Sequence, residues 1–119
     1  METIFYIEGD TLIVELYGEI DHHGADKLRK NIDEEMQVYG TRNLIFDFTR
    51  VVFMDSSGIG VVLGRYKKVK ALEGTVLIRN ANRLVKQILD MSGVFTLMAY
   101  EDRPIDVTGG SNGKKLYQG

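Results

Sequence analysis

The stretch from residue 43 to residue 64, NLIFDFTRVVFMDSSGIGVVLG, decides the fold because it joins a buried strand to a helix. Its first residues, Asn43 to Phe48, form a short continuous apolar run that is typical of a strand buried on both faces. A helix is expected to begin near Ser57. A strand that leads into a helix in this way is the repeating unit of α/β proteins.

The sequence on both sides of this stretch continues the alternation. Residues 3–7 and 12–16 are short β-branched and aromatic runs joined by Glu8-Gly9-Asp10, which predicts a hairpin. Residues 25–39 predict an amphipathic helix that ends at Gly40, with an apolar stripe of Ala25, Leu28, Ile32, Met36 and Tyr39. We expect a strand over residues 75–78 and a last strand over residues 95–100. Between them lies a helix within residues 80–93 that ends at Gly93, with inward positions Leu84, Val85, Ile88 and Leu89.

This order of elements predicts an α/β fold with a mainly parallel sheet after the hairpin. In such a sheet the strand-to-helix loops share one edge, so GEIDHHG, TRVVFMDSSG and RNANR are expected to meet there. We expect one domain over residues 1–108. The tail, residues 109–119, is rich in glycine and lacks apolar periodicity, so we expect it to be flexible, with little regular structure.

Composition excludes several classes of function. With 119 residues, 44% hydrophobic and 27% charged, the chain has the make-up of one globular domain. Its net charge of -2 provides no basic face, so nucleic acid is not an expected partner. The absence of cysteine excludes disulfides, thiolate metal sites and thiol catalysis. No apolar run suggests a signal peptide or a membrane span, so we expect a cytoplasmic protein without a membrane partner.

The glycines of the central stretch do not fit a nucleotide loop. Gly58, Gly60 and Gly64 are one residue too widely spaced for G-x-G-x-x-G, and no G-K-[ST] follows. A serine hydrolase with Ser57 as nucleophile would need a base such as His22 or His23 within hydrogen-bond reach. The G-x-S-x-G elbow is missing, and a polar loop that caps the next helix is the simpler interpretation of the histidines. Two adjacent histidines without a third ligand also do not indicate zinc.

The helix after Ser57 has a second unusual feature. Its apolar residues predict a buried stripe of Ile59, Val62, Leu63, Tyr66 and Val69. The opposite, exposed side is then expected to carry Ser57, Gly60, Val61, Gly64, Arg65 and Lys68. Because glycine in a helix costs about 0.5–1 kcal/mol relative to alanine, two exposed glycines indicate close approach of a partner or of a neighbouring loop. Ser57 itself can be explained simply as the helix N-cap.

Three segments together resemble one protein family. GEIDHHGADKLR, LIFDFTRVVFMDSSGIGVVLGRYKKVK and ILDMSGVF are similar to segments of the bacterial anti-sigma-factor antagonists of the STAS domain family. The resemblance spans about residues 4–100, and the DHH and GRYK elements resemble the antagonists of the sporulation stage II (sigma F) system. It fails at the C-terminus, where relatives carry a last amphipathic helix and this chain has RPIDVTGGSNG.

The resemblance implies a regulatory role without enzymatic activity. The second serine of D-S-S-G is phosphorylated in the family by the anti-sigma factor, an ATP-dependent serine kinase, and Ser57 matches that position. The unphosphorylated protein would bind the kinase and release the sigma factor, and a PP2C-type phosphatase would reset the switch. ATP would belong to the partner, the chain itself would need no cofactor or metal, and it would be a monomer when free.

These inferences give a candidate partner-binding surface and one alternative class of module. The surface comprises Asp21, His22, Asp55, Ser56, Ser57, Gly58, Gly60, Val61, Gly64 and Arg65. Phosphorylation would add about -1.5 to -2 charges beside Asp55, and near Asp21 if the loops converge, so a surface change is expected rather than refolding. A STAS scaffold module that binds another protein or a small anion without kinase control is the alternative to the kinase substrate.

Overall fold

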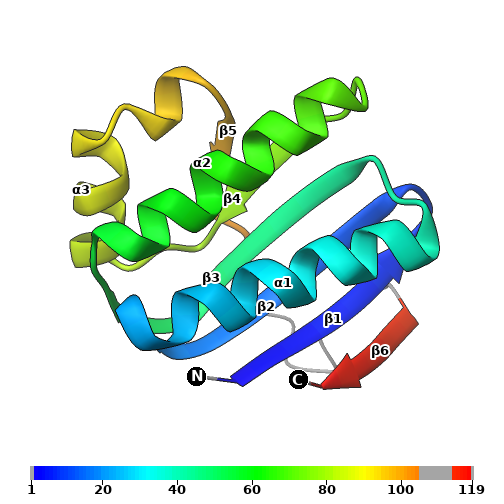
Figure 1. The fold of residues 1–119 in the computed structure, drawn as a ribbon. Helices are drawn as coiled ribbons and strands as arrows, with labels where there is room; N and C mark the ends of the chain where they lie inside the picture. The colour runs from blue at the N-terminus through cyan, green and yellow to red at the C-terminus, as the bar shows by residue number, and fades with distance from the viewer. Residues whose placement is uncertain (1, 105–113, 119) are drawn as a thin grey trace.

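A computed structural model describes residues 2–104 and 114–118 and contains one sheet with the strand order β5-β4-β3-β2-β1-β6 (Figure 1). Along the chain the elements are β1 (Glu2–Glu8), β2 (Thr11–Ile20), α1 (His22–Tyr39), β3 (Asn43–Met54), α2 (Ser56–Ala71), β4 (Val76–Arg79), α3 (Arg83–Met91), the 3-10 helix η1 (Val94–Thr96), β5 (Ala99–Glu101) and β6 (Lys114–Gln118). The predicted α/β class is confirmed.

The first two strands form the expected hairpin. β1 and β2 are antiparallel with Glu8 opposite Thr11, so Gly9 and Asp10 make the turn, and Gly9 takes a left-handed φ of 59°. β2 then pairs in parallel with β3, β3 with β4, and β4 with β5. The sheet is therefore mainly parallel after the hairpin, as expected.

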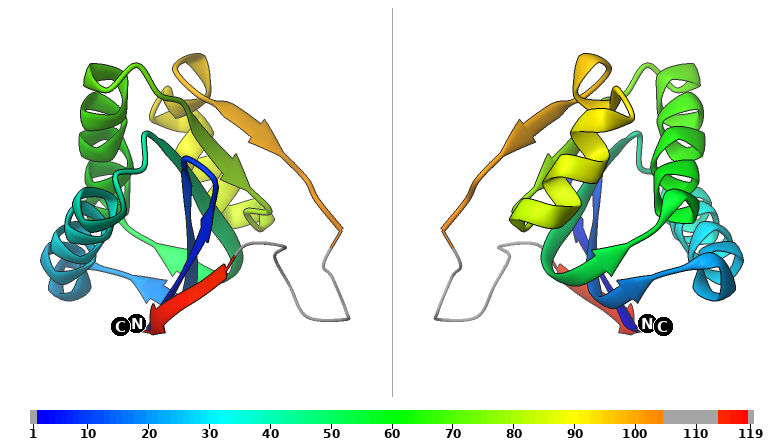
Figure 2. Two further views of the ribbon diagram at one scale, coloured as in Figure 1. Left: turned by 90° about the vertical axis from the view of Figure 1, so that its right-hand side faces the viewer. Right: turned by 90° about the vertical axis from the view of Figure 1, so that its left-hand side faces the viewer.

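The core lies between the sheet and its helices. Alternate residues of β2 and β3 point to this side and are fully buried, among them Leu12, Val14, Leu44 and Phe46. Helices α1 and α2 lie side by side across these strands, and Figure 2 shows both on the same side of the twisted sheet. Each fully buried side chain of this kind stabilises the fold by about 1.5–3 kcal/mol. Packing of the two helices on β2 and β3 therefore fixes where their ends lie.

Some details of the helices differ from the sequence prediction. α1 ends as expected at Gly40, whose φ of 63° is left-handed and whose N–H donates to the carbonyl of Met36. Tyr39, expected on the apolar stripe, is 50% exposed because it lies in the last turn, beyond the part of α1 that contacts the core. Leu84, expected to face inward, is 48% exposed, because the short α3 buries only Val85 and Leu89.

The C-terminal part differs more. The strand expected over residues 95–100 is wrong in its first half, because Gly93, with φ 82°, begins the η1 turn, and β5 covers only Ala99–Glu101. The Thr96 hydroxyl donates to the Gly93 carbonyl at 2.7 Å, which holds this turn. Little regular structure was expected after residue 108, yet residues 114–118 pair with β1 as β6. Residues 109–113 and 119 of the predicted tail lie outside the described part of the chain.

Gly58 and Gly60 provide a matched test of the packing of α2. A Cβ at Gly58 would lie 2.7 Å from Sδ of Met54 and 3.2 Å from Cγ2 of Ile20, whereas a Cβ at Gly60 would have nothing within 4 Å. We expect Gly58→Ala to lower the free energy of unfolding by about 1–3 kcal/mol through overpacking. Gly60→Ala should raise it by about 0.5–1 kcal/mol through helix propensity. Urea unfolding of the two variants checks this, and equal effects would contradict the packing described for Gly58.

Candidate functional site

The parallel pairing of β2 and β3 brings two acidic residues to the same edge of the sheet. Ile20 and Met54 are partners at the ends of these strands, and the N–H of Asp55 donates to the carbonyl of Ile20 at 3.1 Å. Asp21 and Asp55, which follow these strand ends, each start a helix. In Figure 1 the N-terminal ends of α1 and α2 are neighbours at this edge. The expected convergence of the first two loops is confirmed.

Both helices are capped by these aspartates. The carboxylate of Asp21 accepts a hydrogen bond from the N–H of Gly24 at 3.0 Å, and that of Asp55 accepts one from the N–H of Ser57 at 2.8 Å. Asp55 has the extended backbone of an N-cap, with φ -100° and ψ -170°. The interpretation of Ser57 as the N-cap is therefore wrong. Ser57 is a half-buried residue of the first turn, and capping does not explain its hydroxyl.

The buried face of α2 is rotated by about a quarter of a turn from the predicted one, at about 100° per residue. It consists of Gly58, Val61, Val62, Arg65 and Val69. Val61 and Arg65, expected to be exposed for partner binding, are only 3% and 4% exposed, so that expectation is wrong. The reason is that α2 packs on α1 as well as on the sheet, and Asp33 of α1 attracts the Arg65 guanidinium into this contact.

Arg65 belongs to a small charged cluster between the helices. Its Nε lies 2.9 Å from Oδ1 of Asp33, outside hydrogen-bond geometry, and the Lys68 ammonium donates to Oδ2 of the same carboxylate at 2.7 Å. Burial lowers the pKa of the Arg65 guanidinium, and the neighbouring Asp33 carboxylate opposes that shift. Arg65 therefore fixes α1 against α2 and does not present its charge to solvent.

The remaining predicted residues form a surface at the start of the two helices. Ser56, His22 and Gly60 are exposed, Ser57 and Gly64 are half-buried, and Cβ atoms at either glycine would meet open space. Gly58, by contrast, is buried against Met54 and is not available to a partner. We call the accessible set the Ser57 surface, and it consists of Asp21, His22, Asp55, Ser56, Ser57, Gly60 and Gly64.

Two apolar residues beside this surface were missed from the sequence. Val52 and Phe53, near the end of β3, are 60% and 40% exposed. In sequence they are part of an apolar run, which does not distinguish a buried strand end from an exposed one. The one available signal was that Val51, Val52 and Phe53 are three consecutive apolar residues, which breaks the apolar–polar alternation of a half-buried strand. Exposed apolar area of this kind, two and three residues before Asp55 in the chain, is a feature that protein interfaces use.

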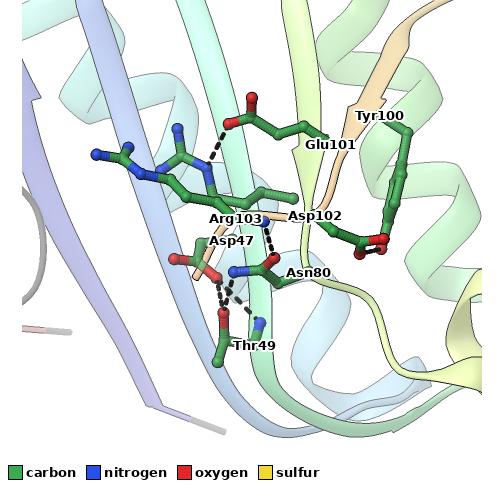
Figure 3. A network of polar contacts seen from close by, with 8 residues as sticks. Asp47, Thr49, Asn80, Tyr100, Glu101, Asp102 and Arg103 are labelled. Atoms are coloured by element: carbon green, nitrogen blue, oxygen red, sulfur yellow. Dashed lines mark hydrogen bonds and ion pairs between the residues drawn. The ribbon is translucent and has the colours of Figure 1, made fainter. Parts of the chain in front are cut away.

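The third loop, RNANR, is attached to the middle of β3 by asparagines. The side-chain N–H of Asn80 donates to the Thr49 hydroxyl at 3.0 Å, and Asp47 accepts from that hydroxyl at 2.5 Å (Figure 3). Asn82 donates to the carbonyl of Val51 at 3.0 Å and caps α3 by accepting from the N–H of Val85. This loop therefore lies against β3 before Phe53 and positions α3 near the same edge.

Residues of β5 complete this polar network on the side of the loop. Glu101 pairs with Nε of the buried Arg79 at 3.0 Å, and Asn80 accepts from the backbone N–H of Arg103 (Figure 3). The Tyr100 hydroxyl donates to Asp102 at 2.7 Å, and burial together with this hydrogen bond raises the pKa of Tyr100 to about 12. The network thus holds β3, β4 and β5 together through side chains as well as the backbone.

The described residues give little support to catalysis at Ser57. Among them, no hydrogen bond joins Ser57 to His22 or His23, whose rings lie 6.0 Å apart on exposed side chains. No group of three or more His, Cys, Asp or Glu side chains within residues 2–104 and 114–118 has the arrangement of a metal site. No described helix is long and apolar enough to cross a membrane. Within the described residues, Ser57 therefore has no hydrogen-bonded base beside it.

The capping geometry predicts different roles for two neighbouring residues. Asp55→Ala should lower the free energy of unfolding by about 0.5–2 kcal/mol, because it removes the N-cap of α2. Ser57→Ala should change it by less than about 0.5 kcal/mol, because the hydroxyl caps nothing. Thermal and urea unfolding of both variants tests the assignment. If Ser57→Ala lowered the free energy of unfolding more than Asp55→Ala, Ser57 rather than Asp55 would be the N-cap of α2.

The comparisons of this chain with known proteins agree on one family. The profile described as STAS domain matches residues 3–108. The anti-sigma F factor antagonist of Paenibacillus polymyxa is 40% identical over 95 residues, which cover 80% of this chain and 81% of that protein. The resemblance noted in the sequence is confirmed.

Solved structures agree with the sequence comparison. The anti-sigma factor antagonist SpoIIAA in its unphosphorylated form is similar with a TM-score of 0.78 at 29% identity, over 87% of this chain and 89% of that one. The Bacillus cell fate determinant SpoIIAA in its phosphorylated form gives a TM-score of 0.71 at 28% identity, over 87% and 92%. The chain belongs to the STAS domain family and is related within it to the anti-sigma factor antagonists.

Proposed function

We propose that this chain is an anti-sigma F factor antagonist controlled by phosphorylation of Ser57. The unphosphorylated Ser57 surface binds an anti-sigma factor that is also a serine kinase, and this binding releases the sigma factor. The observation that carries the proposal is the position of Ser57, beside two aspartates and the exposed Gly60 at the N-terminus of α2. Support also comes from relatives named as anti-sigma F factor antagonists and from a solved relative in a phosphorylated form.

The electrostatics of the Ser57 surface suit a switch. A phosphate on Ser57 adds about -1.5 to -2 charges next to Asp55 and close to Asp21. The N-terminus of α2 offsets about 0.3–1 kcal/mol of the repulsion, so the phosphorylated chain stays folded. A partner that packs closely on the unmodified serine then meets a bulky dianion without matching donors. Binding is lost through this local change and needs no movement of the backbone.

The glycines explain how a partner approaches α2. A Cβ at Gly60 or Gly64 would point into open space, so the absence of side chains there is not required by packing within the chain. Glycine at such positions lowers helix propensity by about 1 kcal/mol each, and close approach of a partner backbone is a sufficient reason for them.

The other components of the system follow from this role. ATP is bound by the kinase, so this chain needs no cofactor and acts as a substrate and binding partner rather than as an enzyme. A PP2C-type phosphatase removes the phosphate and restores binding. Relatives named as anti-sigma F factor antagonists support a role in sporulation transcription, in the cytoplasm where sigma factors act.

Ser57→Ala tests the switch, with Ser56→Ala as the matched control. The Ser57 variant should bind the anti-sigma kinase and remain bound after ATP is added, because no phosphate is accepted. The wild type and Ser56→Ala should dissociate as a single phosphoserine forms. Analytical size exclusion with and without ATP, followed by mass spectrometry, measures both events. Release of Ser57→Ala by ATP would assign the switch to another residue, and binding that ATP never affects would favour a scaffold module without kinase control.

Gly60→Arg tests the docking face. The arginine side chain would stand between α2 and the partner backbone, so kinase binding should weaken at least about a hundredfold, while helix propensity favours the variant. Val38→Arg places the same side chain at a 74% exposed position near the end of α1 and should bind normally. Calorimetric titration and thermal unfolding provide the two readouts. Unchanged binding by Gly60→Arg would exclude Gly60 from the interface.

A further inference from the structure

A cavity of about 380 Å³ lies between the C-terminal parts of α1 and α2, at the end of the helix pair opposite Ser57. Figure 1 shows the two helices diverging toward these ends. Ser57 and Lys68 are separated by about 16 Å along α2, at about 1.5 Å per residue. We call this space the far-end cavity, and its size is within the range of about 300–1,000 Å³ found for small-molecule sites. It shares no residue with the Ser57 surface.

The walls of the far-end cavity are mostly apolar. Met36 of α1 and Leu72 at the end of α2 line it, and Leu72 is 48% exposed although it is a large apolar residue. Thr41, also in the wall, is only 2% exposed, and its hydroxyl has no hydrogen-bond partner within the described residues. The cavity therefore suits a compound with an apolar body.

The rim of the cavity supplies more hydrogen-bond donors than acceptors. Lys68 uses one of its three donors on Asp33, and Arg42 uses one of its five on Asp10 through an exposed pair of 3.1 Å. Among the described residues, Asp33 is the only carboxylate in the wall, and both its oxygens already face the cations Arg65 and Lys68. The donors that remain free match a ligand with an anionic head group.

The helix ends oppose this charge preference only weakly. The C-termini of both helices lie near the cavity, and each helix dipole disfavours an anion at an exposed site by less than about sixfold in affinity. Some carbonyls in the last turns of these helices already accept hydrogen bonds from the backbone. The N–H of Thr41 donates to the carbonyl of Met36, and the N–H of Gly74 donates to the carbonyl of Val69 at 2.9 Å. The side-chain donors of Lys68 and Arg42 therefore decide the preference.

We propose that the far-end cavity binds a small amphipathic carboxylate, with its apolar body against Met36 and Leu72 and its carboxylate at Lys68 and Arg42. This site is separate from the proposed partner-binding role and does not depend on it. The carboxylate accepts from the free donors of the two cations, and the apolar body displaces water from the walls.

Titration of the isotope-labelled protein with octanoate, followed by two-dimensional amide NMR, tests the site. Saturable shifts are expected at the amides of Gly40, Thr41, Lys68 and Leu72, and not at Ser57. Octanol, which lacks the charge, and acetate, which lacks the apolar body, should each bind at least about tenfold more weakly. If octanol bound as tightly as octanoate, the assignment of the carboxylate would be wrong. If acetate bound as tightly as octanoate, the apolar walls would not contribute and the proposed site for an apolar body would be wrong.

Variants locate the carboxylate. Lys68→Met keeps the aliphatic stem and removes the ammonium, so octanoate affinity should fall about tenfold. Lys70→Met, at an exposed lysine of the same helix turn that does not line the cavity, should bind octanoate as the wild type does. Leu72→Glu should abolish binding while its spectrum remains that of the folded protein. No saturable shifts at these amides, or equal losses in Lys68→Met and Lys70→Met, would overturn the proposal.

Discussion

The pairing of Ile20 with Met54, where parallel β2 and β3 end, is the constraint on which the functional part of this structure depends. The N–H of Asp55 donates to the carbonyl of Ile20, so β2 and β3 both end at the same edge of the sheet. Each then meets an aspartate that caps a helix, which places two carboxylates and two helix N-termini together. A shift of one residue in this register would turn the alternating side chains to the wrong faces and separate Asp21 from Ser57.

Under the proposed function, the position of Ser57 explains how phosphorylation of one side chain could prevent partner binding. Ser57 is in the first turn of a helix whose cap is already provided by Asp55, so its hydroxyl is available for chemistry without loss of the fold. The same aspartate ensures that a phosphate arrives next to an existing negative charge. A single group therefore caps the unmodified helix and, under the proposed function, would add to the negative charge of the modified surface.

The strand and helix order, the hairpin and the shared edge of two loops could be predicted from the sequence, because each depends on local patterns and on the geometry of parallel sheets. The orientation of α2 could not. A hydrophobic pattern treats arginine as exposed, whereas Arg65 is buried beside Asp33 of α1. Gly58 is buried against Met54, which leaves no room for a Cβ. The burial of Arg65 depends on a partner that is distant in sequence, and the burial of Gly58 depends on how closely the backbone of α2 approaches β3. The exposure of Val52 and Phe53 likewise depends on what lies beyond the end of β3.

The central claim is that a phosphate on Ser57 prevents binding by changing the surface and not the fold. The most direct measurement compares the affinity of the anti-sigma kinase for the unmodified and the Ser57-phosphorylated chain, with amide NMR spectra of both free forms. We expect affinity to fall at least about a hundredfold, or about 2.7 kcal/mol, with chemical shift changes confined to residues near Asp21 and to the first turns of α2. Equal affinities, or shifts spread through the core between α1, α2 and the sheet, would contradict the account.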